Sequence, residues 1–147
     1  MRTVSAAAYV PAPPSDVFEF LADLENLPSW QSGIVSAELT TPKPVGVGSR
    51  AHVVRNFLGQ RIEVDITVVG YEPGRRVQLE SAASGIGVQA RLDLEPKDEG
   101  TDLSFAIDIR AQSIFMAPVE GMVAGAAEQD VADSLERIRA NFVTPPA

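Results

Sequence analysis

Few side chains in this 147-residue chain can do chemistry, and their types exclude several kinds of site. His52 is the only histidine, and there is no cysteine. A two-histidine metal site, a thiolate metal site, a disulfide and a cysteine nucleophile are therefore excluded, and we expect neither a metal nor another cofactor. A Ser-His-Asp triad would need His52 to face the interior, beside a serine and a carboxylate.

The direction of His52 follows from the register of a predicted hairpin. Strand patterns at 49–58 and 61–71 flank the hairpin signal "LGQ", and we take the turn at Gly59-Gln60, which sets Phe57 opposite Ile62. Side chains alternate along a strand, so this register places Val53, Arg55 and Phe57 together on the inward face of the first strand of the hairpin. His52 belongs to the other set and points outward, which disfavours a catalytic role.

The same register makes Arg55 the only cation on an inward strand row. A buried guanidinium must be paired or solvated, which leaves three interpretations. Arg55 binds a ligand carboxylate in a bidentate way, pairs with an Asp or Glu of the chain, or reaches solvent at the strand end. A one-residue bulge would turn it outward. Inward strand positions carry no carboxylate, so we expect no acid–base pair in the interior.

The elements that position these residues show as periodic patterns. Alternation predicts strands at 3–10, 34–40, 49–58 and 61–71, then three more whose inward rows begin with Val77, Ile86 and Leu103. Two short helices are predicted at 14–22 and 24–30, and a helix of about 25 residues, or ~37 Å, begins at Pro118. The sheet is antiparallel with one apolar face, which the long helix can cover. We predict one α+β domain over 1–147.

Charge and composition restrict the partners. The formal net charge is -8, and the longest Lys/Arg run is the pair Arg75-Arg76, so nucleic acid and anionic membranes are unfavourable partners. No segment approaches the ~18 uncharged apolar residues of a membrane span. The lack of cysteine fits a reducing cytoplasm, which is where we expect the protein. The sequence does not set the oligomeric state.

Four stretches carry a resemblance to a known family: "PAPPSDVFEFLADLENLPSWQ", "PVGVGSR", "VVGYEPGRRVQLES" and "SIFMAPVEGMVAGAAEQDVADSLERIRANF". They resemble the START-like helix-grip superfamily, often called SRPBCC, and within it the polyketide cyclase/dehydrase and lipid-transport group. The resemblance implies a curved seven-stranded antiparallel sheet wrapped around the long C-terminal helix, with two short helices after the first strand. It also implies a ligand cavity between sheet and helix.

The residue types expected beneath the long helix support such a cavity only in part. Small residues gather in the first turns of the long helix, where they either leave room or fill a close helix–sheet contact: Gly121, Ala124, Gly125, Ala126 and Ala127. Trp30 either lays its indole against a ligand at the cavity mouth or plugs the core. Phe115 and Met116, ahead of the long helix, form either a lid over the opening or a hydrophobic staple. The predicted ligand-binding residues are Leu27, Trp30, Val53, Arg55, Phe57, Ile66, Val68, Leu79, Val88, Ala90, Leu92, Phe105, Ile107, Phe115, Val119, Met122, Val123 and Ala126.

Three functions fit these patterns. The first is binding of a small apolar or amphipathic molecule, lipid-like or polyketide-like, by burial of apolar area. The second is a cofactor-free cyclase, aromatase or dehydratase, in which the pocket folds a reactive chain. We rank this function below the first because the inward rows are apolar. The third is a protein-interaction component, such as a toxin partner, that uses the outer face of the long helix.

Overall fold

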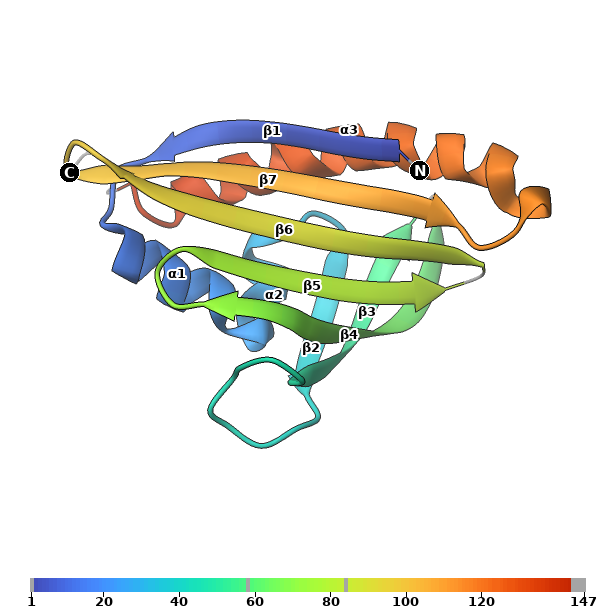
Figure 1. Cartoon of the computed structure of the whole chain (residues 1–147), viewed down its shortest axis with the longest axis horizontal. Helices are drawn as coiled ribbons and strands as arrows, with labels where there is room; N and C mark the ends of the chain where they lie inside the picture. The colour runs from blue at the N-terminus through green and yellow to red at the C-terminus, as the bar shows by residue number, and fades with distance from the viewer. Residues whose placement is uncertain (1, 58, 84, 144–147) are drawn as a thin grey trace.

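The computed structural model describes residues 2–57, 59–83 and 85–143, and within them seven strands form one antiparallel sheet (Figure 1). The spatial order is β1-β7-β6-β5-β4-β3-β2. The strands are β1 (Arg2–Val10), β2 (Ile34–Leu39), β3 (Arg50–Phe57), β4 (Gln60–Glu72), β5 (Arg76–Ala83), β6 (Ile86–Lys97) and β7 (Gly100–Ala111). The helices are α1 (Pro14–Ala22), the 3-10 turn η1 (Leu24–Asn26), α2 (Leu27–Trp30), the 3-10 turn η2 (Ile114–Met116) and α3 (Ala117–Ala140).

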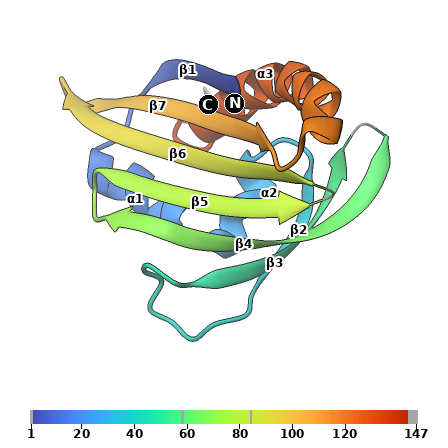
Figure 2. The same cartoon turned by 45° about the vertical axis from the view of Figure 1, so that its right-hand side comes forward.

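The sheet curves around α3, which confirms the predicted helix-grip fold. Figures 1 and 2 show α3 behind β1 and β7, while α1 and α2 cover the same face of the sheet lower down, behind β5 and β4. Register shifts interrupt the pairing of β2 with β3, between Ile34 and Ser36, and of β4 with β5, between Val68 and Gly70. Because such bulges bend a strand and increase its twist, they help the sheet to curve. No helix in the described part of the chain is both long and apolar enough to cross a bilayer.

The segment that connects β1 to β2 follows its sequence signals, with one correction. Pro14 lies in the first turn of α1, where its missing N–H costs no hydrogen bond, and Asp16 adds a negative charge to the positive helix end. The helix predicted at 24–30 is divided into η1 and α2. Asp23 caps the first part by accepting a hydrogen bond from the backbone N–H of Glu25. Pro28 is tolerated because α2 has only four residues.

The β3–β4 hairpin has a different register from the predicted one but the same inward face. Phe57 pairs with Gln60 rather than with Ile62, a displacement of two residues. Leu58, which the predicted turn placed at the end of the strand, lies outside the described residues. Because side chains alternate with a period of two, a two-residue displacement leaves every side chain on its predicted face. Val53 is fully buried and His52 is partly exposed on the opposite face, as predicted.

Candidate functional site

A cavity of about 490 Å³ lies between the inner face of the sheet and the first half of α3. Most of its wall is aliphatic, from β2 to β7 on one side and α3 on the other: Ile34, Val53, Ile62, Val64, Ile66, Leu79, Ile86, Val88, Ala90, Ile107, Ile109, Met116, Val119, Met122, Val123 and Ala127. Three lining side chains, Gln60, Glu80 and Met122, are exposed to solvent, and Met122 keeps 61% of its surface accessible. The cavity therefore opens to solvent beside the start of α3.

The empty space does not come mainly from the small residues of α3. Of the five small residues in its first turns, only Ala127 lines the cavity. Gly121 faces Arg2 of β1, and Gly125 faces open space. The lining residues of α3 instead include Val119, Met122 and Val123. We therefore attribute the room to the curvature of the sheet rather than to the small residues of α3.

Arg55 faces the cavity and pairs with Asp130, so the native-carboxylate interpretation is the one observed. The Arg55 Nη2 atom donates to Asp130 Oδ2 over 3.2 Å, and the two side chains are 20% and 24% exposed. Burial lowers the pKa of the Arg55 guanidinium, which the charge of Asp130 partly offsets. Burial likewise raises the pKa of the Asp130 carboxyl, against the lowering effect of Arg55. Both shifts follow from the partial burial of the pair.

Sequence reasoning missed Asp130 and four polar residues that also line the cavity: Gln31, Gln60, Glu80 and Ser81. A signal for Asp130 was present. Val119, Val123, Ala127 and Asp130 follow one another at spacings of four, four and three residues, which places them on one face of a helix. The expectation of no acid–base pair considered strand rows only, and the helix supplies the carboxylate.

Ten of the predicted ligand-binding residues line the cavity: Val53, Arg55, Ile66, Leu79, Val88, Ala90, Ile107, Val119, Met122 and Val123. Five others do not line it, and all have 0% exposure. Val68, Leu92 and Phe105 lie on inward rows of the sheet that continue past the cavity into a packed end, and Leu27 and Trp30 belong to α2. Ala126 lies on a different face of α3 and is half-buried. The side chain of Phe57 is outside the described part of the structure.

Trp30 is a core residue rather than part of the cavity mouth. Its side chain is fully buried, and its ring meets Phe105 edge-on, with centroids 5.8 Å apart and planes at 68°. This edge-to-face contact adds to the area that two aromatic rings bury. Among the described residues, the indole Nε1–H has no hydrogen-bond partner, which carries a desolvation cost. The plug interpretation therefore describes its position.

Phe115 is neither packed as a staple nor folded over the opening. Its side chain is 88% exposed, and that of Ile114 is 83% exposed. A staple requires the residue before the helix to pack on the first turns, which such exposure contradicts. Met116 does enter the cavity wall, and it lies against Gly85 of the β5–β6 turn. Of the two apolar residues singled out before the helix, Met116 lines the cavity and Phe115 does not.

His52 lies on the outer face of the sheet, away from the cavity. Its Nδ1 and Nε2 atoms lie 3.0 Å from carboxylate oxygens of Asp65 and Glu63, respectively. Hydrogen bonds to Glu63 and then to Asp65 raise the pKa of His52. Among the described residues there is no group of three or more His, Cys, Asp or Glu side chains that could hold a metal ion. The outward direction predicted for His52 is correct.

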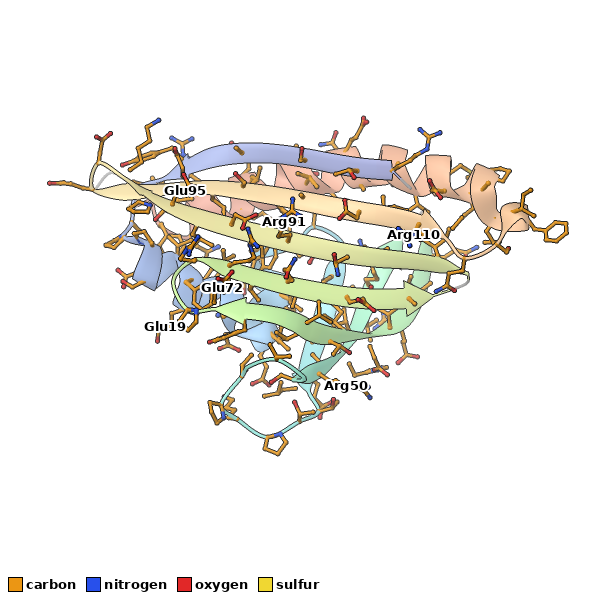
Figure 3. All side chains as sticks on the ribbon, viewed as in Figure 1. Glu19, Arg50, Glu72, Arg91, Glu95 and Arg110 are labelled. Atoms are coloured by element: carbon orange, nitrogen blue, oxygen red, sulfur yellow. The ribbon has the colours of Figure 1, made fainter. Side chains whose placement is uncertain are left out.

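The outer face is otherwise charged. Figure 3 shows Arg91 and Glu72 on the side of the sheet that faces the viewer, opposite α1 and α3. Arg91 Nε donates to Asp93 over 3.0 Å, and Asp93 also accepts from Arg76. The one wet face and one dry face that alternation predicts are both present, so the cavity lies on the dry side.

Comparisons with known proteins agree with this geometry. The family model described as polyketide cyclase / dehydrase and lipid transport matches residues 1–143. The uncharacterized protein Rv1546 of Mycobacterium tuberculosis is 25% identical over 138 residues, which cover 93% of this chain and 96% of that protein.

Two solved structures are similar in fold. TTHA0849 from Thermus thermophilus has a TM-score of 0.78 at 20% identity, covering 96% of this chain and 97% of that one. A START superfamily protein from Mycobacterium smegmatis has a TM-score of 0.77 at 17% identity, covering 96% and 99%. The family model matches nearly the whole chain, and the sheet grips α3 as in these two structures, so this chain belongs to the polyketide cyclase / dehydrase and lipid transport family.

Proposed function

We propose that the protein binds a small apolar or amphipathic molecule, lipid-like or polyketide-like, in the cavity beneath α3. One observation carries the proposal: an aliphatic hollow of about 490 Å³ that opens to solvent. Ligand pockets of this size and apolar character enclose most of a small molecule's surface. Water inside such a hollow meets few polar partners, so an apolar ligand that replaces it removes apolar surface from water on both sides.

The magnitude of that effect indicates what size of ligand the site needs. Burying ~400 Å² of apolar surface contributes about 10 kcal/mol at ~25 cal/mol per Å². Association costs about 4 kcal/mol or more in lost freedom. The remainder corresponds to a dissociation constant on the order of tens of micromolar. A ligand with an extended chain or several fused rings can bury that area, whereas a short solvent-like molecule cannot.

The test is a pair of valine-to-tryptophan variants on opposite faces of the sheet. Val88→Trp adds an indole to the cavity wall, whereas Val69→Trp adds one at a residue that is 38% exposed and does not line the cavity. Titration with the neutral fluorophore N-phenyl-1-naphthylamine measures binding, and a thermal melt checks folding. We expect Val88→Trp to weaken binding by about tenfold or more, a loss of ~1.4 kcal/mol, while Val69→Trp binds like the wild type. Equal binding by both variants, or none by the wild type, would contradict the proposal.

A second candidate is a cofactor-free enzyme of the cyclase or dehydratase type, and one observation favours it. Arg55 and Asp130 are two ionisable groups within hydrogen-bond distance inside an apolar cavity. Burial raises the pKa of Asp130, which makes a carboxylate a better proton acceptor. Incubation with a linear poly-β-keto thioester, followed by mass spectrometry, tests this function. Loss of water that depends on Asp130 would support it, and an unchanged substrate would contradict it.

A further inference from the structure

The ion pair on the cavity wall indicates which class of ligand the cavity accepts, if the proposed function holds. We propose that the cavity selects amphipathic ligands whose polar group is an uncharged hydroxyl or carbonyl, and that it disfavours carboxylates. This is the opposite of what an isolated inward-facing arginine suggests, since such an arginine attracts a carboxylate. The difference comes from Asp130, a single residue on α3.

The geometry of the pair explains the selection. Arg55 lies on β3 and Asp130 on α3, so the 3.2 Å contact joins the sheet to the helix at the cavity wall. The charge of Arg55 is matched within the protein before any ligand enters. A ligand carboxylate would compete with Asp130 for the guanidinium and leave two carboxylates in one partly buried place, which disfavours the charged form of both.

The other charges around the cavity act in the same direction. Glu80 of β5 adds a second carboxylate to the lining, at an exposed position on the rim. Asp133, one turn further along α3, also raises the pKa of Asp130, so negative charge faces the pair from the helix too. Among the described lining residues, Arg55 is the only cation against these carboxylates. The whole chain carries a formal charge of -8 as well.

An uncharged polar group meets no such conflict. Asp130 Oδ2 accepts from Arg55, and among the described residues the second oxygen, Oδ1, accepts no hydrogen bond. A ligand hydroxyl can donate to that oxygen, and a hydroxyl or carbonyl oxygen can accept from a guanidinium N–H. Hydrogen bonds to charged groups are stronger than neutral ones. The pair can therefore orient a neutral polar head while the aliphatic wall takes the chain.

The first experiment compares two ligands that differ only in the polar group. Dodecan-1-ol and dodecanoate are titrated against bound N-phenyl-1-naphthylamine at pH 8, below their aggregation limits. We expect dodecan-1-ol to displace the fluorophore at about tenfold lower concentration. Dodecanoate that displaces it equally well or better would overturn the inference while leaving the proposed function intact. Failure of the fluorophore itself to bind would contradict the proposed function, and the inference with it.

The second experiment reverses the selection through Asp130. Asp130→Asn keeps the shape of the side chain but removes its charge, so Arg55 becomes available to a ligand carboxylate. We expect the ratio of the two displacement concentrations to shift towards dodecanoate by about tenfold or more. The matched control is Glu128→Gln, which makes the same charge change at an exposed residue of α3 outside the lining. An equal shift in both variants, or none in Asp130→Asn, would overturn the inference.

Discussion

The inner face of the sheet has two ends that the same alternation of residues encodes but that pack differently. At one end, Phe105 packs edge-on against Trp30, and Leu92 and Leu103 belong to the same buried cluster, all four with 0% exposure. At the other end the same strands, β6 and β7, contribute the wall of the cavity. α1 and α2 cover only the first end. Alternation thus identifies which side chains face inward, while the helices decide which of them are packed.

Strand β4 shows the difference within a single element. Val64, Ile66 and Val68 all face inward, since they alternate along one strand. Val68 is fully buried and does not line the cavity, whereas Val64 lines it and is only half-buried. The packed core and the cavity wall therefore lie at different ends of the same strand, and substitutions along it can separate stability from the proposed ligand binding.

The largest effect is expected at the packed end. Phe105→Ala removes a ring with 0% exposure that packs edge-on against Trp30, and we expect it to lower the free energy of unfolding by about 3–5 kcal/mol. The matched control is Phe115→Ala, at a side chain that is 88% exposed, where we expect a change within about 0.5 kcal/mol. Urea denaturation followed by circular dichroism measures both. Similar losses of stability for the two variants would mean that the ring of Phe105 is no better packed in solution than the exposed ring of Phe115.

A smaller effect is expected from two identical substitutions on β4. Val68→Ala leaves a void in a packed region and should cost about 1.5–3 kcal/mol. Val64→Ala enlarges a space that is already empty, so we expect less than half that loss in the same denaturation assay. In the binding assay the order should reverse, with Val64→Ala altering fluorophore affinity more than Val68→Ala. Equal destabilisation by both would mean that the cavity end is packed in solution.

The smallest effect is expected on the outer face behind the cavity, where His52 joins β3 to β4 through Glu63 and Asp65. The pKa of His52 in the folded protein is raised above 6.5, so the folded state binds the proton more tightly than the unfolded state. The stabilisation is complete below the unfolded pKa and is lost as the pH rises through the folded pKa. We expect the melting temperature of the wild type to fall slightly across that window.

His52→Ala provides the control, because His52 is the only histidine in the chain. This part of the pH dependence should disappear in the variant, and the imidazole resonances of the wild type should titrate with a pKa above the ordinary value for histidine. If the wild type and the variant keep the same pH dependence, the contacts of His52 with Glu63 and Asp65 do not stabilise the folded protein.

The sequence predicted the elements well because their signals are local. The alternating rows gave seven strands, and the change to helical spacing at Pro118 gave α3, which begins at Ala117. The face of Arg55 was predicted correctly although the hairpin register was displaced by two residues, since only an odd displacement changes faces. The division of 24–30 into η1 and α2 was missed because short helices carry few signals.

The candidate site was predicted only in part, for a physical reason. Periodicity by itself determined that Val53, Arg55 and Val88 face the interior, because which side of a strand a residue occupies depends on its neighbours in the chain. Whether an inward residue lines a hollow or a packed core depends on which helix lies above it, and for that reason the sequence left both the mouth and the plug position open for Trp30, which is buried. The partner of Arg55 is 75 residues away in the chain. Only the tertiary structure, which brings α3 over β3, decided that an arginine open to ligand carboxylates is instead half of a neutral pair.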